Sequence, residues 1–449
     1  MSYRRRLATA LTLGCLATLA MAVLADQLPS APAELGTIRR NERGQLEVVP
    51  TPADAPAGAA GTADDPAAAK RAMQTMSLEK KAPAAAASGK TIVVGPQEQI
   101  RSIQEAARIA RDGDTVEIRP GEYRQQAVVW TQARLTIRGS GQRPLLIADG
   151  DSAEGKALWV VRRADMLIEN IEFRGVRVPD GNGAGIRFEN GHLRVVRCAF
   201  FNNETGILAG NAADAVLEVE DSEFGEAPTH AGALHHLLYA GTIARLSIKG
   251  SRFQQGFRGH LIKSRARESM ILYNMLVDGV DGRASYELEF PNGGVAWVIG
   301  NVIGQSDKTD NQDLVSYGAE GQRWPDNALY LAHNTLINNW SGGRFLRVWA
   351  DKMPPGTEVW ALNNLLVGQG VFVPQAPGRY DGNRLVDRSA LIDVDHLGFS
   401  LPNNSPLRGT AKSPGSVREQ SLTPGAEFKL PVGIRPLPVG KPLSPGALQ

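Results

Sequence analysis

Short strand-like segments recur along the central part of the chain. Each ends on an apolar residue, and most carry a polar residue two positions earlier. The segments are Ile171-Glu172-Phe173, Cys198-Ala199-Phe200, Ser222-Glu223-Phe224, Ser251-Arg252-Phe253, Asn274-Met275-Leu276, Asn301-Val302-Ile303, Asn334-Thr335-Leu336 and Asn364-Leu365-Leu366. Their last residues are 23 to 33 positions apart. This variable spacing is typical of a repeated core from which loops of different length emerge.

One such unit, with two or three short strands, cannot bury its apolar face alone. Stacked as coils, the units bury a continuous core and pair their backbone groups with the coils above and below. A propeller blade needs about 40–50 residues per repeat, and the leucine code of leucine-rich repeats is absent from the sequence. The pattern therefore predicts an all-β solenoid, a parallel β-helix. The asparagines that begin the later segments suit either a left-handed turn conformation or a stacked side-chain ladder.

The beginning of this region supports the prediction. Residues 102–110 have helical periodicity, and Gly113-Asp114-Thr115-Val116 and Pro120-Gly121-Glu122-Tyr123 then mark a turn and a strand start. The run resembles the capping helix and first coil of the pectate-lyase-like superfamily. The resemblance covers about residues 91–370 and implies a right-handed parallel β-helix, a scaffold most often used on polysaccharides. Residues 371–449 are expected to form an irregular strap, partly packed on its flank.

The N-terminus has the pattern of an export signal. Three arginines, residues 4–6, precede an apolar run from Leu7 to Ala25 with small residues near its end. We expect residues 1–25 to be cleaved and the protein to be periplasmic or secreted; an uncleaved run would anchor the chain in a membrane. Residues 26–90 are rich in Ala, Pro, Asp and Gly, and this composition predicts a flexible linker.

The charge balance narrows the choice of partner. The chain has 49 Lys and Arg against 47 Asp and Glu, and removing residues 1–25 leaves 46 against 47. This near-neutral balance gives no reason to expect nucleic acid or a membrane surface as the general partner. Only Cys198 would remain in the mature chain, so a disulfide framework and a cysteine metal site are excluded.

One strand position in successive coils is unusually polar. Period-two alternation places an apolar set inward, namely Leu238, Ile262, Leu288, Val315 and Leu346. The outward row is then Tyr239, Lys263, Glu289, Ser316 and Arg347. Stacked strands lie about 4.8 Å apart, so Lys263 is expected between Tyr239 and Glu289. Alternation also places Arg265 and Glu287 one outward step to either side.

These residue types suit β-elimination of a uronic-acid polymer. The reaction needs a cation to neutralise the sugar carboxylate, a base to remove the C5 proton and an acid to protonate the leaving oxygen. A lysine or a tyrosine can act as base beside another cation. The predicted catalytic residues are Lys263, Tyr239, Arg265, His235 and Glu289. The predicted substrate-binding residues are Arg267, His260, Glu287 and Arg347.

The run Gly259-His260-Leu261-Ile262-Lys263-Ser264 resembles part of the chondroitinase-B and alginate-lyase family. The resemblance spans about fifty residues. It implies that Lys263 acts as base, that an arginine one coil later acts as acid, and that calcium neutralises the carboxylate. The chain departs from this pattern because Glu289 stands where the arginine would fall. Candidate calcium ligands are Glu287, Glu289 and Glu320, fewer oxygens than such a site usually needs.

Three functions are consistent with the sequence. The first is a polysaccharide lyase, or a C5-epimerase that shares its proton abstraction, acting on an acidic polysaccharide. The second is a glycoside hydrolase that pairs Glu287 with Glu289 or Glu320, since carboxylates about 5–9 Å apart are the required geometry. The third is a non-enzymatic carbohydrate-binding or envelope scaffold, in which the Lys263–Glu289 pair is ordinary cross-strand stabilisation.

Overall fold

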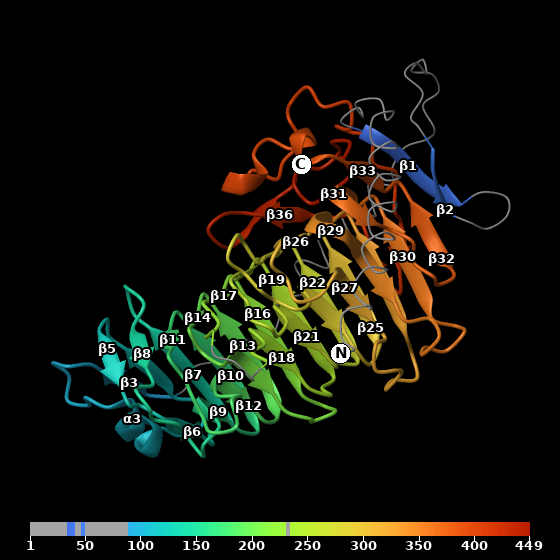
Figure 1. The fold of residues 1–449 in the computed structure, drawn as a ribbon. Coiled ribbons are helices and arrows are strands. Elements are labelled where there is room, and N and C mark those ends of the chain that lie inside the picture. Colours follow the sequence, from blue (N-terminus) through green and yellow to red (C-terminus); the bar gives the residue numbers. More distant parts are fainter. Residues whose placement is uncertain (1–33, 41–45, 50–88, 230–233) are drawn as a thin grey trace, which may run out of the picture.

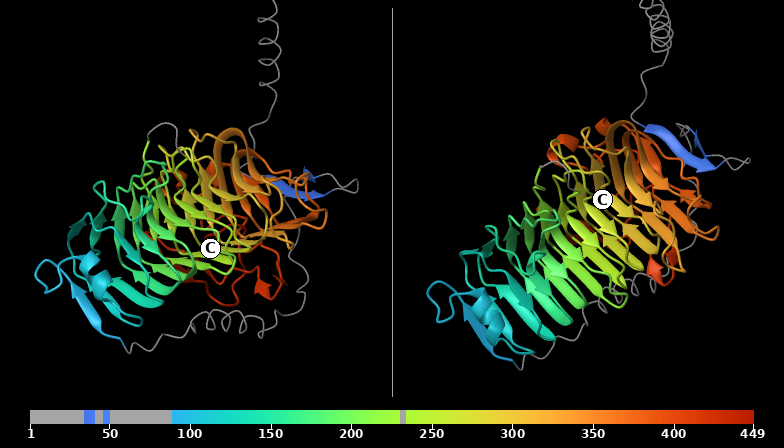
Figure 2. Two further views of the ribbon diagram at one scale, coloured as in Figure 1. Left: turned by 90° about the horizontal axis from the view of Figure 1, so that it is seen from below. Right: turned by 60° about the horizontal axis from the view of Figure 1, so that its bottom comes forward.

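The computed structural model describes residues 34–40, 46–49, 89–229 and 234–449. Within these ranges the chain winds into a right-handed parallel β-helix, in which each strand pairs in parallel with the strands one coil before and after it. Figures 1 and 2 show the coils stacked along one axis from the N-terminal to the C-terminal end. The predicted fold class is confirmed.

Three strand ladders form the faces of the solenoid. The first face contains β3 (Thr91–Val94), β4 (Thr115–Ile118), β7 (Arg134–Gly139), β10 (Ala164–Glu169), β13 (Gly191–Val196), β16 (Val216–Glu220), β19 (Arg245–Lys249), β22 (Glu268–Leu272), β25 (Val295–Ile299), β28 (Ala328–Ala332), β30 (Glu358–Leu362) and β32 (Gly378–Asp381). The second contains β5 (Glu122–Arg124), β8 (Leu145–Ile147), β11 (Glu172–Arg174), β14 (Ala199–Phe201), β17 (Glu223–Gly225), β20 (Arg252–Phe253), β23 (Met275–Val277), β26 (Val302–Gln305), the start of β29 (Thr335–Val348), β31 (Leu365–Val371) and β33 (Arg384–Val386). The third contains β6 (Val128–Trp130), β9 (Ala157–Val161), β12 (Ala184–Phe188), β15 (Thr205–Ala209), β18 (Leu238–Ala240), β21 (Ile262–Ser264), β24 (Leu288–Phe290), β27 (Asp313–Tyr317) and the end of β29.

The recurring segments supply the second face. Their apolar last residues point inward and stack from coil to coil, because a fixed register places equivalent residues in line. Phe173, Phe200, Phe224 and Phe253 are parallel rings with centroids 5.1, 4.8 and 4.4 Å apart. Leu276 continues the ladder in register with Phe253. The repeat predicted from the sequence therefore corresponds to one coil of the solenoid.

The asparagines that begin the later segments form a buried ladder. The side-chain oxygen of Asn301 accepts the backbone N–H of Asn274 at 2.8 Å, and that of Asn334 accepts the N–H of Asn301 at 2.9 Å. Asn364 and Asn383 extend the pattern. The left-handed residue is the one before each asparagine, as at His333 and Asn363. Of the two arrangements that the sequence allowed, the stacked ladder is therefore the one adopted by the asparagine side chains.

A short helix, α3 (Ile103–Ile109), lies near the first coils (Figure 1). The hydroxyl of Ser102 accepts the backbone N–H of Glu105 and caps the helix start. Ile103 and Ala106 are fully buried and belong to the solenoid core. The periodicity over residues 102–110 thus corresponds to a real helix.

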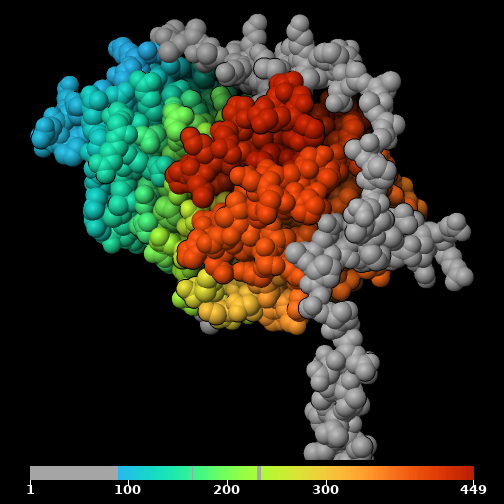
Figure 3. Space-filling view, turned by 90° about the horizontal axis from the view of Figure 1, so that it is seen from above, coloured from blue at the N-terminus to red at the C-terminus, as the bar shows by residue number. Residues whose placement is uncertain are grey.

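At the other end, the coils continue past residue 370 to β33. The chain then forms two short 3-10 helices, Arg388–Ala390 and Val394–His396, and two small hairpins, β34 (Ser416–Val417) with β35 (Gln420–Ser421) and β36 (Ala426–Phe428) with β37 (Ile434–Pro436). Phe399 and Phe428 pack on the outer side of the second face, and Leu422 packs beside Tyr330 of the first. Figure 3 shows this C-terminal segment, in orange and red, lying over the earlier coils.

The predicted linker is only partly described. Within residues 26–90, where the sequence predicts a flexible linker, the structure contains β1 (Glu34–Arg40) and β2 (Leu46–Val49). Strand β1 pairs antiparallel with β33, whose outer edge would otherwise carry unpaired backbone groups. The expected export signal, residues 1–25, lies outside the described residues. Among the described helices, none is long and apolar enough to cross a membrane.

Candidate functional site

The predicted polar row lies on the third face in the predicted register. Tyr239 pairs with Lys263, Lys263 with Glu289, Glu289 with Ser316, and Ser316 with Arg347. The alternating apolar residues are buried in the core: Leu238, Ile262, Leu288, Val315 and Leu346. The face assignment made from the sequence is therefore correct within the strands.

Before the strands, the alternation breaks. Strands β18, β21 and β24 are only three residues long, and each is preceded by a second inward residue. This position is occupied by Leu237, Leu261 and Glu287, all of which are buried. Backbone hydrogen bonds keep the three in register: the N–H of Leu237 donates to the His260 carbonyl, and the N–H of Leu261 donates to the Tyr286 carbonyl. The predicted outward position of Glu287 is therefore wrong.

Glu287 lies wholly in the core, and neither carboxylate oxygen has a hydrogen-bond partner. Burial, with a further contribution from the charge of Asp278, holds the pKa of Glu287 well above its usual range. His235 is displaced by the same break in alternation and is fully buried. Neither the predicted substrate-binding role of Glu287 nor the predicted catalytic role of His235 fits a side chain sealed from the surface.

An aromatic row takes the place of His235: it contains the predicted residue His260 and two residues that sequence reasoning missed, His236 and Tyr286. His236, His260 and Tyr286 stand three residues before Tyr239, Lys263 and Glu289, respectively, and stack in successive coils. The ring centroids of His236 and His260 are 4.7 Å apart, and those of His260 and Tyr286 are 4.9 Å apart. This common spacing of three was visible in the sequence and could have identified the row.

Two carboxylates hold Lys263. Its Nζ atom lies 3.1 Å from Oε2 of Glu289 and 3.4 Å from Oε1 of Glu320, and its side chain is 13% exposed. Glu289 is only 3% exposed, and its Oε2 also lies 2.9 Å from Nε2 of His260. These contacts with Oε2 lack hydrogen-bond angles, so the attraction is mainly between charges and dipoles.

Arg265 joins this cluster to Tyr239. Its Nε–H donates to the phenol oxygen at 2.8 Å, so the phenol hydrogen points away from Arg265. The two terminal nitrogens of Arg265 donate hydrogen bonds to the carboxylate oxygens of Glu320 at 2.6 and 2.8 Å, and one of them also donates to Asn292. We call Tyr239, Lys263, Arg265, Glu289 and Glu320 the charged cluster; its two cations and two carboxylates balance.

The ring nitrogens of the two histidines have defined roles. Nδ1 of His236 accepts the backbone N–H of His260 at 2.9 Å, and Nδ1 of His260 accepts that of Tyr286 at 3.4 Å. In each ring the proton is therefore on Nε2. Burial, together with the positive charges of Lys263 and Arg265, holds the pKa of His236 well below its usual range. His236 is thus neutral at neutral pH, and its Nε2–H is a hydrogen-bond donor.

The two carboxylates of the cluster are ionised. Burial pushes the pKa of Glu289 upward, but contacts with His260 and Lys263 outweigh burial and leave the pKa of Glu289 below its usual range. The hydrogen bonds from Arg265 lower the pKa of Glu320 as well. Neither side chain is thus prepared to donate a proton at neutral pH.

The remaining predicted residues lie around the cluster. Arg267 is exposed at the turn after β21. Arg347 continues the row beyond Ser316, with its guanidinium 4.3 Å from the ring centroid of Trp349. Lys352 lies 4.4 Å from the centroid of the same ring. Two cations therefore lie against the ring of Trp349, and one of them, Lys352, also donates to the carbonyl of Ala319 at 2.8 Å.

The residues present do not fit the calcium site that the resemblance implies. Glu287 is in the core, and Glu289 and Glu320 already contact cations of the chain. Within the described ranges, no group of three or more His, Cys, Asp or Glu side chains could hold a metal ion.

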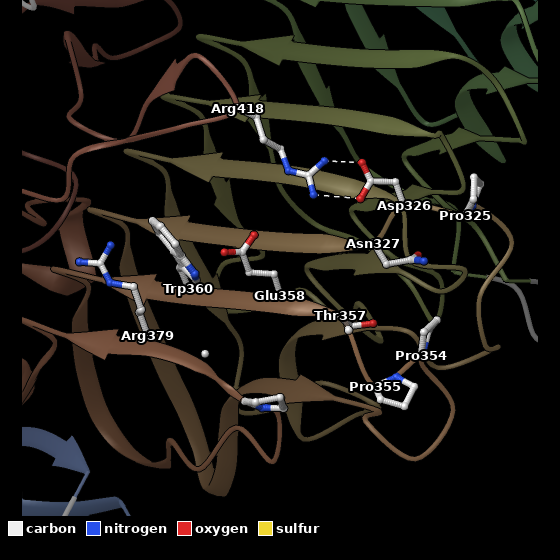
Figure 4. A pocket seen from close by; sticks show the side chains of 13 residues that line it. Pro325, Asp326, Asn327, Pro354, Pro355, Thr357, Glu358, Trp360, Arg379 and Arg418 are labelled. Atoms are coloured by element: carbon white, nitrogen blue, oxygen red, sulfur yellow. Dashed lines mark hydrogen bonds and ion pairs between the residues drawn. The ribbon is translucent and has the colours of Figure 1, made fainter.

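A separate pocket of about 610 Å³ opens beside strands β28, β30 and β32 (Figure 4). Arg379 lies over Trp360, 4.3 Å from its ring centroid, and Arg418 pairs with Asp326. Glu358, also in the lining, accepts a hydrogen bond from Tyr330 at 2.6 Å. None of the predicted site residues lines this pocket.

The sequence matches no known protein family and no curated protein. The chain is similar to three solved structures of lyases. Pectate lyase Pel9A is 12% identical, with 76% of this chain and 96% of that chain covered and a TM-score of 0.49. The PL6 family alginate lyase AlyGC is 15% identical, with 78% and 47% covered and a TM-score of 0.37, so this chain spans about half its length. The PL6 family polysaccharide lyase Pedsa3628 from Pseudopedobacter saltans is 12% identical, with 67% and 94% covered and a TM-score of 0.34.

Proposed function

We propose that this protein binds a uronic-acid polysaccharide along its third face and cleaves it by β-elimination. One observation carries the proposal: two cations, Lys263 and Arg265, adjoin a tyrosine at the surface of the solenoid. Such a surface offers both requirements of the reaction, neutralisation of a carboxylate and transfer of a proton. The resemblance of the Lys263-Ser264 run to β-helix lyases points in the same direction.

Arg265 and Lys263 would bind the sugar carboxylate. A guanidinium binds a carboxylate through two parallel hydrogen bonds, and Arg265 already makes this contact with Glu320. A carboxylate so held withdraws charge from C5 and stabilises the anion that forms when the C5 proton leaves. Arg347 and Arg267 would contact carboxylates farther along the polymer.

Tyr239 is the residue best placed to take the C5 proton. His236 and His260 carry their protons on Nε2 and use Nδ1 as acceptor, so neither ring offers a free lone pair. Lys263 contacts two carboxylates through its ammonium group, which can donate a proton but has no lone pair to accept one. This assignment differs from the lysine base that the family resemblance implies.

In the proposed step, the phenol oxygen of Tyr239 acts in its deprotonated form and accepts the proton from C5. Charge on this oxygen is stabilised by the Nε–H of Arg265. The electron pair of the C5–H bond forms the C4–C5 double bond while the C4–O bond breaks. Lys263 delivers a proton to the leaving oxygen. Delivery of a different proton to C5 from the opposite side, with the C4–O bond left intact, would instead give a C5-epimerase.

The hydrolase alternative has less support. It needs one carboxylic acid with a raised pKa at the surface, beside a second carboxylate. Glu287 has the raised pKa but is sealed in the core, whereas the pKa values of Glu289 and Glu320 are lowered. No pair among these three glutamates combines access with the required protonation states.

Purified protein should be incubated separately with alginate, pectate and glycosaminoglycans. The proposal predicts ultraviolet absorbance from an unsaturated product with at least one polymer. Reducing ends without this absorbance would favour a hydrolase. Binding without any product, unchanged in Lys263→Ala and Glu289→Gln, would establish the carbohydrate-binding scaffold.

A further inference from the structure

The turn that follows β27 carries Glu320 to the charged cluster from two coils away. Gly318 and Gly321 adopt left-handed backbone angles, and the N–H of Gly321 donates to the Gly318 carbonyl. The N–H of Glu320 donates to the Pro291 carbonyl at 2.8 Å, and Asn292 donates to the Gly321 carbonyl at 3.3 Å. The backbone of the turn is therefore fixed on the coil before it, while the Glu320 side chain reaches one coil farther.

The Glu320 carboxylate makes the contacts that a bound carboxylate would make. Both its oxygens accept from Arg265, at 2.6 and 2.8 Å, and one lies 3.4 Å from Nζ of Lys263. The side chain is 44% exposed, whereas that of Glu289, the other partner of Lys263, is 4% exposed. Glu289 is thus a buried part of the site, and Glu320 is the carboxylate that solvent can reach.

We propose that Glu320 is an internal stand-in for the substrate carboxylate, and that a uronate displaces it when the polymer binds. This inference rests on the proposed function of the charged cluster. The exchange conserves charge, because one carboxylate leaves Arg265 and Lys263 as another arrives. An exposed carboxylate with a long side chain can turn into solvent at small cost, while the glycine-bounded turn stays in place.

The exchange makes Glu320 a specificity-determining residue. A neutral sugar has no group that could replace a carboxylate between two cations, so binding it would leave Glu320 in position over the site. A uronate repeats both hydrogen bonds to Arg265. The contact with Glu320 therefore disfavours neutral polymers and lowers the affinity for a lone carboxylate.

The test compares the wild type with Glu320→Gln and with a matched control, Glu154→Gln. Glu154 also contacts an arginine and a lysine, at 2.6 and 3.9 Å, but far from the cluster. Calorimetric titrations measure the dissociation constants for acetate and for a short oligouronate of defined length. Thermal midpoints verify that each variant is folded.

We expect Glu320→Gln to bind both ligands about two- to five-fold more tightly, the range that an exposed ion pair contributes. Glu154→Gln should bind like the wild type, and adding Arg265→Gln to Glu320→Gln should abolish the gain. Wild-type binding of the oligouronate with no gain in Glu320→Gln for either ligand would overturn the exchange but leave the proposed function standing. A gain for acetate alone, with no oligouronate bound by either protein, would support the exchange and count against the proposed function. No gain and no binding would overturn both.

Discussion

Replacing Glu287 by glutamine should stabilise the protein at neutral pH. Glu287 is fully buried without a hydrogen-bond partner, and its pKa is raised by burial and by the nearby Asp278. A carboxyl whose pKa is raised in the folded state favours folding below its unfolded pKa. That contribution disappears as the pH rises, because the unfolded chain releases the proton that the folded chain retains. Glutamine keeps the shape and removes the titration.

The size of the effect follows from the pH interval. The unfolded glutamate titrates at about pH 4.3, and each pH unit above this value costs about 1.4 kcal/mol while the folded carboxyl stays protonated. As the pH rises from the unfolded pKa toward the raised pKa of the folded carboxyl, the free energy of unfolding of the wild type should therefore fall by about 1.4 kcal/mol per pH unit relative to Glu287→Gln. Asp278, whose pKa is raised to about 6, adds a further decrease, but it is present in both proteins.

Denaturant unfolding at a series of pH values measures this difference. The curves of free energy against pH should diverge as the pH rises, with the variant above the wild type at pH 7. The control is Glu122→Gln on β5, where the side chain is 60% exposed, and its curve should run parallel to that of the wild type. Parallel curves for Glu287→Gln and the wild type would show that folding does not change the pKa of Glu287. This result would refute the reasoning.

Two further substitutions test the site and the fold. Lys263→Met should abolish turnover and also lower the free energy of unfolding by about 3 kcal/mol, because buried Glu289 loses its cation. Adding Glu289→Gln should recover part of the stability but no activity, as measured by denaturant unfolding and product assay. Asn301→Ala should destabilise the protein by about 2–5 kcal/mol, because the N–H of Asn274 and the carbonyl of Ile271 lose buried partners; a change below about 1 kcal/mol would show that the ladder is dispensable.

The repeat and the outward row were predictable because they depend on local patterns. Equivalent residues recur at coil spacing, and alternation holds within each strand. Counting the alternation beyond a three-residue strand misplaced His235 and Glu287, since an extra inward residue precedes β18 and β24. The strand boundary, rather than the pattern inside it, was the missing information.

The ion pairs of the site depend on longer connections. Glu320 meets Arg265 only because a turn after β27 reaches back across two coils, and no periodicity in the sequence reports this path. The Lys263–Glu289 pair was expected from the register, but its burial was not, because the flanking aromatic row was overlooked. The likeness of His236, His260 and Tyr286 in position is apparent once the coils are aligned.

The central claim is that Tyr239 removes a proton from C5 of a uronic-acid residue. Incubating the wild type and Tyr239→Phe with alginate, pectate and glycosaminoglycans in heavy water, with ultraviolet absorbance and nuclear magnetic resonance at C5 recorded together, tests it most directly. The account predicts an unsaturated product, or deuterium at C5 for an epimerase, with the wild type and neither with Tyr239→Phe. Equal C5 chemistry in both proteins, or none on any of these polymers with the wild type, would contradict it.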